Sequence, residues 1–229
     1  MNETDILVIS DIHLGSDICN AKMLLETLQS YEYRKLIIVG DLFQDGGVLN
    51  DEHFEVIKYL RAYREKIKCI DGNHDPVEES LVNGVIGIHV VKKYHWEMNG
   101  KKLCAMHGHQ FDKWCFIFSE PFIDRFFLNF MWLLKMVTIK GWSLASWFES
   151  FHNEFSRRLA DRAIKYARKK NIDMIICGHT HQPVHVKFRG KKSEVDYFNC
   201  GAWVENMCSF ITIDKDCNIQ LHLVSCSAS

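Results

Sequence analysis

The chain has 229 residues, a length that fits one large domain or a compact domain carrying an insertion. Hydrophobic residues make up 47% and charged residues 25% of the sequence, and these proportions exclude an intrinsically disordered or low-complexity protein. The 28 basic residues nearly cancel the 29 acidic ones, so no overall positive charge favours a protein that coats nucleic acid, and no nucleic-acid partner is expected.

Two features of the sequence bear on where the protein works. The nine cysteines are odd in number without C-x-x-C spacing, and the first ten residues, MNETDILVIS, lack the basic and apolar regions of a secretion signal. The most apolar window, Phe126 to Leu134, is much shorter than the roughly 18 apolar residues that a membrane-spanning helix needs. We therefore predict a reducing, cytoplasmic location and no transmembrane helix.

Short apolar runs alternate along the chain with stretches of helical spacing. Helices are predicted at 21–33 and 51–66, where apolar residues recur every three or four positions. Buried strands are predicted at 6–9, 36–39, 67–70, 103–106 and 174–177. After residue 183, alternating segments at 184–188, 195–198, 207–214 and 219–224 predict antiparallel strands that close a second sheet. The pattern is that of an α/β chain with an all-β end.

The segment from Phe111 to Phe151 departs from this alternation. Its 41 residues hold 13 of the 28 aromatic residues of the chain, where an even spread would give about five. We expect helices inserted between two strands. Two interpretations remain open, an amphipathic helix pair that belongs to the core and an apolar cap over a hydrophobic ligand.

Polar side chains follow each of the five predicted buried strands. Ligands of open α/β sheets bind beyond the carboxyl ends of the strands, so these positions should approach one crevice. Within D-x-H and H-x-H, extended backbone sends the two side chains to the same side, where each pair can hold a metal ion. The candidate donors are Asp11, His13, Asp41, Asn73, His107, His179 and His181.

Seven carboxylate, amide and imidazole donors are too many for one ion. Donors of these kinds suit manganese, iron, zinc or cobalt. Two ions with a carboxylate between them would use all seven, and Asp41, which stands alone after its strand, is the candidate bridge. His109 lies two residues beyond His107, and its role is left open between a ligand and a neighbour of the site.

The ordered set D-I-H, G-D, G-N-H-D, H-G-H and G-H-T-H resembles the calcineurin-like metallophosphoesterases, and the resemblance covers nearly the whole chain. It implies a two-layered β-sandwich with flanking helices, here in one domain over residues 1–229 with a helical apolar insertion at about 112–160. It also implies that Asp11, His13, Asp41 and His181 hold one divalent ion, and that Asp41, Asn73, His107 and His179 hold the other. Manganese is the first choice for both ions. His74 takes the position of the catalytic histidine of the family, and Asp75 would orient it.

Within that family, the opening S-D-I-H-L-G-S, the insertion after H-G-x-x-F-D and the closing G-H-T-H-Q-P resemble the UDP-2,3-diacylglucosamine hydrolases of lipid A synthesis and their paralogues. Those enzymes cleave the pyrophosphate of an acylated sugar nucleotide to UMP and a lipid sugar phosphate. The resemblance implies that the insertion holds acyl chains, with Phe122, Phe126, Phe130 and Trp132 as the candidate contacts. Two positions differ from that group, since its best-known members carry Arg in place of His74 and related sequences carry Asp in place of Ala202.

Three hypotheses follow for the function. The first is a pyrophosphatase that acts on a lipidated sugar nucleotide, with peripheral contact to the inner face of a membrane. The second is a soluble phosphodiesterase or nucleotidase. The third is a catalytically silent scaffold, which the intact Asp11, Asp41 and His74 argue against. In the enzymatic hypotheses, His74 either stabilises charge on the phosphoryl group or protonates the leaving oxygen.

Overall fold

The computed structural model describes residues 2–75, 79–112, 144–190, 193–204 and 207–225. In chain order the elements are β1 (Asn2–Ile9), α1 (Ala21–Ser30), β2 (Tyr31–Val39), α2 (Asp51–Ala62), β3 (Ile67–Ile70), α3 (Glu79–Ile86), β4 (Val90–Val91), β5 (Tyr94–Met98), β6 (Lys101–Ala105), α5 (Leu144–Lys170), β7 (Met174–Cys177), β8 (Val184–Arg189), β9 (Glu194–Asn199), β10 (Met207–Ile213) and β11 (Ile219–Ser225). Short 3₁₀ helices lie at Arg64–Lys66 and His109–Phe111. The order mixes helices and strands as the sequence predicted.

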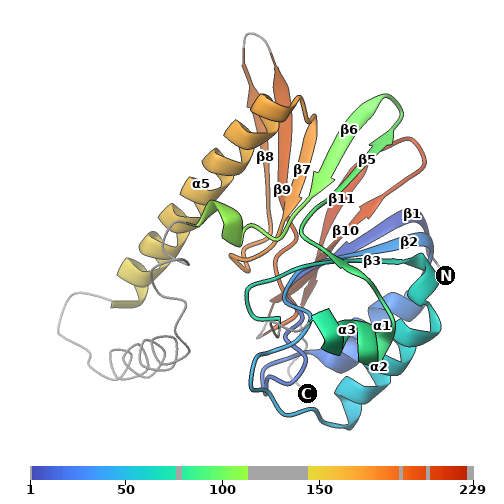
Figure 1. Ribbon diagram of the computed structural model, residues 1–229. Helices are drawn as coiled ribbons and strands as arrows, with labels where there is room; N and C mark the ends of the chain where they lie inside the picture. Colours follow the sequence, from blue (N-terminus) through green and yellow to red (C-terminus); the bar gives the residue numbers. More distant parts are fainter. Residues whose placement is uncertain (1, 76–78, 113–143, 191–192, 205–206, 226–229) are drawn as a thin grey trace.

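The strands form two sheets that pack face to face (Figure 1). The first has six strands in the order β11-β10-β1-β2-β3-β4, and the second has five in the order β5-β6-β7-β9-β8. Within the first sheet β1, β2, β3 and β4 are parallel, and within the second β6, β7 and β9 are parallel. The predicted two-layered β-sandwich with flanking helices is confirmed.

Alternation along the central strands divides the core into three layers. In β1, Ile6 and Val8 face the second sheet, whereas Leu7 and Ile9 face the helices α1 and α2. This follows from the two-residue period of a strand, which turns neighbouring side chains to opposite faces. Both faces of β1 are covered, and so its central residues form a continuous apolar run instead of an alternating one.

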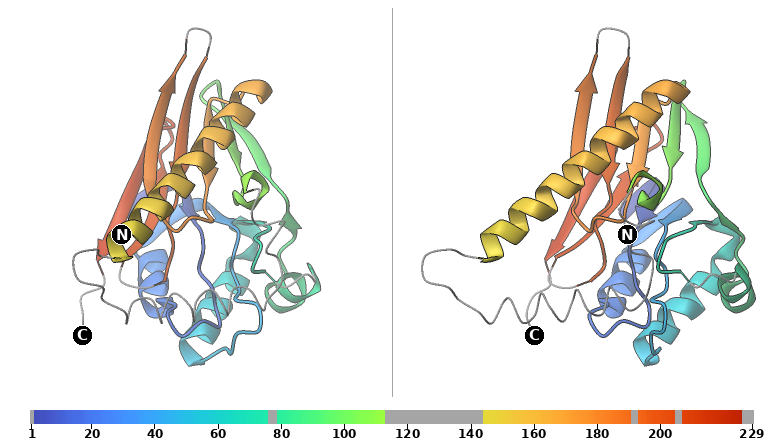
Figure 2. Two further views of the ribbon diagram at one scale, coloured as in Figure 1. Left: turned by 90° about the vertical axis from the view of Figure 1, so that its left-hand side faces the viewer. Right: turned by 60° about the vertical axis from the view of Figure 1, so that its left-hand side comes forward.

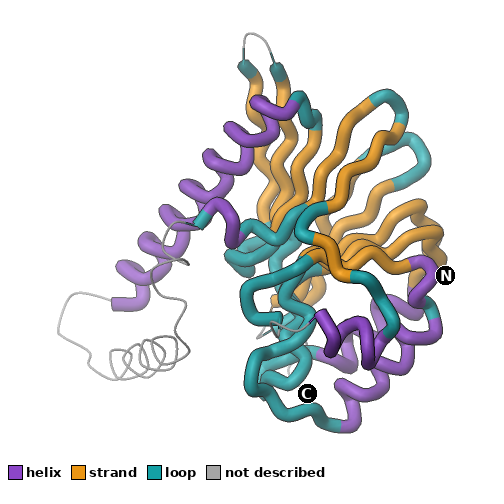
Figure 3. Tube along the Cα trace, viewed as in Figure 1, coloured by secondary structure: helices purple, strands orange, loops and turns teal. Residues whose placement is uncertain are grey.

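Helices cover the outer face of each sheet (Figures 2 and 3). Leu24 and Leu28 of α1 and Val56 and Leu60 of α2 are fully buried against the first sheet. On the second sheet, the described side chains of α5 include Leu159, Ala160, Ala163, Ile164 and Ala167, which pack on the outer residues of β6, β7 and β9. The small alanines on this face let the helix approach the sheet closely.

Two local predictions are corrected by the structure. The predicted helix at 21–33 ends at Ser30, because Tyr31 to Val39 pair with β1 along the whole length of β2. The segments at 207–214 and 219–224 were predicted to close the second sheet, yet β10 pairs with β1 and β11 pairs with β10, both in the first sheet. Only β8 and β9 join the second sheet as predicted.

The predicted insertion falls largely outside the described residues, and with it Phe122, Phe126, Phe130 and Trp132. Its described parts are Asp112 and residues 144–160 of α5, a helix of 27 residues that continues to Lys170. Among the described helices, none combines the length and the apolar character needed to cross a membrane.

Candidate active site

The predicted metal ligands lie where the carboxyl ends of parallel strands from both sheets meet. The loops after β1 and β2 run side by side, with the amides of Asp11 and His13 donating to the carbonyls of Gly40 (3.1 Å) and Asp41 (3.0 Å). The loops after β6 and β7 are joined in the same way by the amide of Gly178, which donates to the carbonyl of His107 (2.8 Å). Four strands thus deliver their first loop residues to one place.

The backbone at these loops adopts a conformation that side chains disfavour. Eight described residues other than glycine have a positive φ, and five of them are predicted ligands: Asp11 (52°), His13 (54°), Asp41 (51°), His179 (71°) and His181 (55°). A left-handed conformation costs a residue with a Cβ about 1–2 kcal/mol, and such strain gathers at functional sites. The concentration of strained backbone in these loops indicates that they form a functional site.

Two glycines make room for the ligand side chains. A Cβ added to Gly40, whose φ is +81°, would lie 2.3 Å from Nδ1 of His107. A Cβ added to Gly72 would lie 2.1 Å from Oδ1 of Asp41. Both distances are far below van der Waals contact, so the positions of His107 and Asp41 depend on glycine at these two points.

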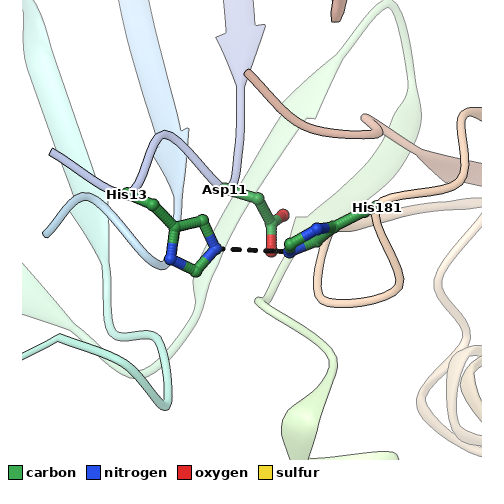
Figure 4. Close-up of side chains that lie close together, drawn as sticks. All are labelled: Asp11, His13 and His181. Atoms are coloured by element: carbon green, nitrogen blue, oxygen red, sulfur yellow. Dashed lines mark hydrogen bonds and ion pairs between the residues drawn. The ribbon is translucent and has the colours of Figure 1, made fainter. Parts of the chain in front are cut away.

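One group of donors brings together residues from the loops after β1 and β7. Oδ1 of Asp11 lies 3.2 Å from Nε2 of His181, and that nitrogen lies 3.2 Å from Nε2 of His13 (Figure 4). One ligand atom of each residue lies within 4.8 Å of the others. Asp11 is fully buried, whereas the side chain of His181 is 38% exposed, so this group reaches from the interior to the surface.

A second group lies deeper. Asp11, Asp41 and His107 each place a ligand atom within 4.8 Å of the others, and all three are buried. Nε2 of His107 lies 3.2 Å from Oδ2 of Asp41 and 3.0 Å from Oδ1 of Asn73. Oδ2 of Asp41 also lies 3.7 Å from Nε2 of His13. Asp41 therefore lies between the two groups, and Asp11 belongs to both.

His179 is the predicted ligand that joins neither group. Its backbone amide donates to both carboxylate oxygens of Asp11 (3.1 and 3.0 Å), but its ring nitrogen Nε2 lies 3.3 Å from Oδ2 of Asp112. Asp112 is 6% exposed and ends the H-G-H-Q-F-D segment. Asp112 is the last residue of the H-G-x-x-F-D motif and directly follows the short 3₁₀ helix His109–Phe111, but it was not assigned to the site from the sequence.

The buried carboxylates of Asp11 and Asp41 need positive charge close by. The described partners in ion pairs with Asp11 and Asp41 are histidines, and no described lysine or arginine pairs with either carboxylate. Burial by itself would raise the pKa of both carboxyls, but the neighbouring imidazoles outweigh it and hold each pKa below its usual value. Burial opposes a proton on His107 as well, yet Asp41 and Asp11 raise its pKa to about 10. Two buried carboxylates ringed by imidazoles fit divalent metal ions, which would supply this positive charge directly.

His74 and Asp75 follow β3 at the edge of the site. The amide of His74 donates to Oδ1 of Asp41 (2.9 Å), and its ring lies edge-on to that of His13 with centroids 5.3 Å apart. Asp75 accepts from the backbone amides of Asp41, Gly72 and Phe43, each at 3.0 Å. Two of these hydrogen bonds tie Asp75 to the loop that carries Asp41, and the orienting role toward His74 that the resemblance implies stays a prediction. Burial raises the pKa of Asp75 to about 6, and the charge of Asp41 adds to this.

His109 lies beside the deeper group. Its ring centroid is 5.4 Å from that of His107 and 6.4 Å from that of His179. Its buried Nδ1 has no described hydrogen-bond partner, and burial lowers its pKa to about 4. Of the two roles that the sequence left open, these contacts favour a neighbour of the ligands.

Comparison with known proteins assigns this site to a family. Residues 4–183 match the family described as calcineurin-like phosphoesterase. The chain belongs to that family. It is a metal-dependent hydrolase of phosphoester bonds.

One curated relative of this phosphoesterase is similar over most of its length. It is a UDP-2,3-diacylglucosamine hydrolase of Blochmanniella pennsylvanica, 26% identical over 224 residues, which cover 86% of this chain and 88% of that protein. Among solved structures, the phosphoesterase YfcE of E. coli is 19% identical with a TM-score of 0.51, and covers 96% of this chain and 98% of its own. An archaeal phosphodiesterase is 14% identical with a TM-score of 0.52, and covers 96% and 99%. At these identities the solved structures support the fold alone.

Proposed function

We propose that this phosphoesterase is a dinuclear pyrophosphatase that cleaves UDP-2,3-diacylglucosamine, or a related acylated sugar nucleotide, to UMP and a lipid sugar phosphate. The main support for two metal ions is the position of Asp41 between the two donor groups. Its Oδ2 lies 3.2 Å from Nε2 of His107 and 3.7 Å from Nε2 of His13. The similarity to the hydrolase of Blochmanniella pennsylvanica supports the substrate.

The proposed ligand sets follow the strand ends. Asp11, His13, Asp41 and His181 would hold one ion, and Asp41, Asn73, His107 and His179 the other. When bound, the two ions would supply Lewis-acid polarisation of the phosphoryl oxygens and a water of lowered pKa. We favour manganese, and zinc, iron and cobalt suit the same donors.

The protein's own groups have two tasks in the reaction. His74 stands beside His13 at the edge of the site, and we propose that its ring faces the phosphoryl group of the substrate. A protonated His74 would stabilise the negative charge that builds on the phosphoryl oxygens, or give its proton to the leaving oxygen as the bond to phosphorus breaks. Asp75 would orient His74, and its hydrogen bonds from the amides of Asp41 and Phe43 would also hold the loop that carries Asp41.

The lipid part of the substrate is assigned to the insertion. The proposal treats residues 1–229 as one domain with a cap at about 112–160, in which Phe122, Phe126, Phe130 and Trp132 contact acyl chains. A substrate of this kind resides in a membrane, so we also propose a cytoplasmic protein that touches the inner face of that membrane peripherally.

A second candidate is a soluble phosphodiesterase or nucleotidase. The observation that favours it is His74 itself, because the G-N-H-D form also resembles general phosphodiesterases, whereas the best-known hydrolases of the acylated nucleotide carry Arg there. In this case the aromatic insertion would belong to the core or to an oligomer contact.

Substrate profiling separates the two candidates. Metal-free protein is prepared with a chelator, reloaded with Mn²⁺, and assayed on UDP-2,3-diacylglucosamine, on the deacylated sugar nucleotide and on a small activated phosphodiester. A clear preference for the acylated nucleotide supports the pyrophosphatase. Equal rates on the acylated and deacylated compounds support the soluble enzyme, and full activity in the chelator-treated sample before reloading contradicts the dinuclear site.

A further inference from the structure

Two of the predicted metal ligands have one ring nitrogen fixed by an oxygen acceptor. Nδ1 of His13 lies 2.9 Å from Oε1 of Gln44, and Nδ1 of His107 lies 2.8 Å from the carbonyl oxygen of Val39. An acceptor fixes the proton on the nitrogen that it contacts and thereby sets the tautomer and orientation of the ring. In both residues this leaves Nε2 toward Asp41.

His179 is anchored through the opposite nitrogen. Its Nε2 lies 3.3 Å from Oδ2 of Asp112. An ionised carboxylate can only accept hydrogen bonds, so Nε2 is the nitrogen that carries the proton in this contact. The lone pair of the neutral ring then lies on Nδ1.

Asp112 is itself held firmly in place. It is buried, and its amide donates to the carbonyl of His109 (2.9 Å) at the end of the 3₁₀ helix. The neighbouring carbonyl of Phe111 accepts a hydrogen bond from Nη1 of Arg162 (2.6 Å), which ties this loop to α5. On the other side, the amide of His179 is fixed on Asp11. Both partners of the contact therefore have anchored backbones.

We infer that Asp112 is a positioning residue for the metal centre, which holds the Nε2 proton of His179 so that this ligand presents Nδ1. The inference rests on the proposed dinuclear site. In this respect His179 differs from His13 and His107, which present Nε2. The inference also assigns a role to the buried carboxylate of Asp112. Loss of such a partner of a ligating histidine typically weakens metal binding by about 10- to 100-fold.

The test combines nitrogen NMR with calorimetry on the full-length protein. In the metal-free parent, ¹⁵N spectra of the histidine side chains should give the Nε2–H tautomer for His179, assigned through its loss in H179A. Titration with Mn²⁺ should then give two binding events in the parent. In D112A one event should weaken by about 10- to 100-fold while the other stays near the parent value. In D112N, whose side-chain oxygen can still accept from Nε2, both events should stay close to those of the parent.

Q44A is the matched control, because it removes the corresponding partner of His13. It should weaken the other binding event, so that the two variants act on different ions. An Nδ1–H tautomer of His179 in the parent would overturn the inference, and this measurement does not depend on any variant folding. Unchanged binding in D112A would overturn it too. Equal loss in D112N and D112A would make Asp112 a ligand instead of a positioning residue. A parent that binds fewer than two ions would count against the proposed dinuclear function itself.

Discussion

A single methyl group at Gly40 tests whether the metal site is packed as tightly as the structure places it. Gly40 has a φ of +81°, and a Cβ there would lie 2.3 Å from Nδ1 and 2.8 Å from Cβ of His107. The left-handed backbone costs alanine about 1–2 kcal/mol, and forcing a side chain into a packed interior costs about 1–3 kcal/mol. The sum predicts that G40A lowers the free energy of unfolding by about 2–5 kcal/mol, or the melting temperature by about 4–20 °C for a chain of this size.

Gly100 supplies the matched control. Its φ is +74°, close to that of Gly40, but a Cβ there would meet no atom within 4 Å. G100A should therefore show only the backbone cost of about 1–2 kcal/mol. The difference between the two variants measures the contact with His107 alone. Urea unfolding of metal-free protein, followed by circular dichroism, gives both free energies without a contribution from bound ions.

Equal destabilisation in G40A and G100A would contradict the predicted clash with His107. Such a result would mean that His107 can move aside at little cost. It would also remove the reason to expect a functional effect, since a displaced His107 loses the hydrogen bond from its Nδ1 to the carbonyl of Val39. If the contact is as close as described, G40A should also bind divalent ions more weakly than G100A.

Two further predictions concern turnover. H74A should lower the rate by about 10²- to 10⁴-fold while the metal content of the purified protein stays near that of the parent, because His74 is assigned to the substrate; a parallel loss of metal and rate would make it a ligand or a fold determinant. Replacing residues 116–142 by a short flexible linker should abolish hydrolysis of an acylated substrate yet preserve cleavage of a small activated phosphodiester, with folding checked by circular dichroism. Loss of both activities together with unfolding would indicate that these residues are core, and retention of both would assign them no part in substrate binding.

The strand ends of the site were readable from the sequence because each is a local pattern. A buried strand is a short apolar run, and the residue that follows it must lie at the sheet edge, whatever the rest of the chain does. Asp11, Asp41, His107 and His179 were placed in this way, before any pairing of strands was known. The proposed bridging role of Asp41 came from the same argument, because Asp41 is the only predicted ligand in the loop after β2.

What the sequence left open depends on contacts between distant segments. Tyr31 to Tyr33 were predicted as the end of a helix, but they pair with β1 as part of a strand, so tertiary contacts override local propensity. The place of β10 beside β1 joins residues about 200 positions apart and has no local signature. In the same way, Asp112 and His179 are 67 positions apart in the sequence, and neither their residue types nor their spacing predicts that they are in contact.

The protonation of the histidines leads to a last prediction, for the protons released when metal binds. In the metal-free protein Asp41 and Asp11 overcome the effect of burial and raise the pKa of His107 to about 10, and Asp11 raises that of His181 as well. Burial lowers the pKa of His13 and of His179. The raised pKa of His107 also means that its interaction with Asp41 and Asp11 stabilises the fold fully below the ordinary pKa of about 6.5, and that this stability is lost as the pH rises through about 10. Because of these pKa shifts, His107 is charged near neutral pH, whereas His13 and His179 are neutral.

An ion binds a ring nitrogen only after its proton has left, so binding must displace the proton of His107. Calorimetric titration with Mn²⁺ at pH 7 in PIPES and in HEPES, which differ in ionisation enthalpy, should give a release of about one proton or more per chain. Affinity should also rise with pH above neutrality, because competition from the proton on His107 weakens as the pH approaches about 10. Release of well under one proton, or an affinity independent of pH, would mean that His107 is already neutral. The buried carboxylates of Asp11 and Asp41 would then lack the positive charge of His107 in the metal-free protein.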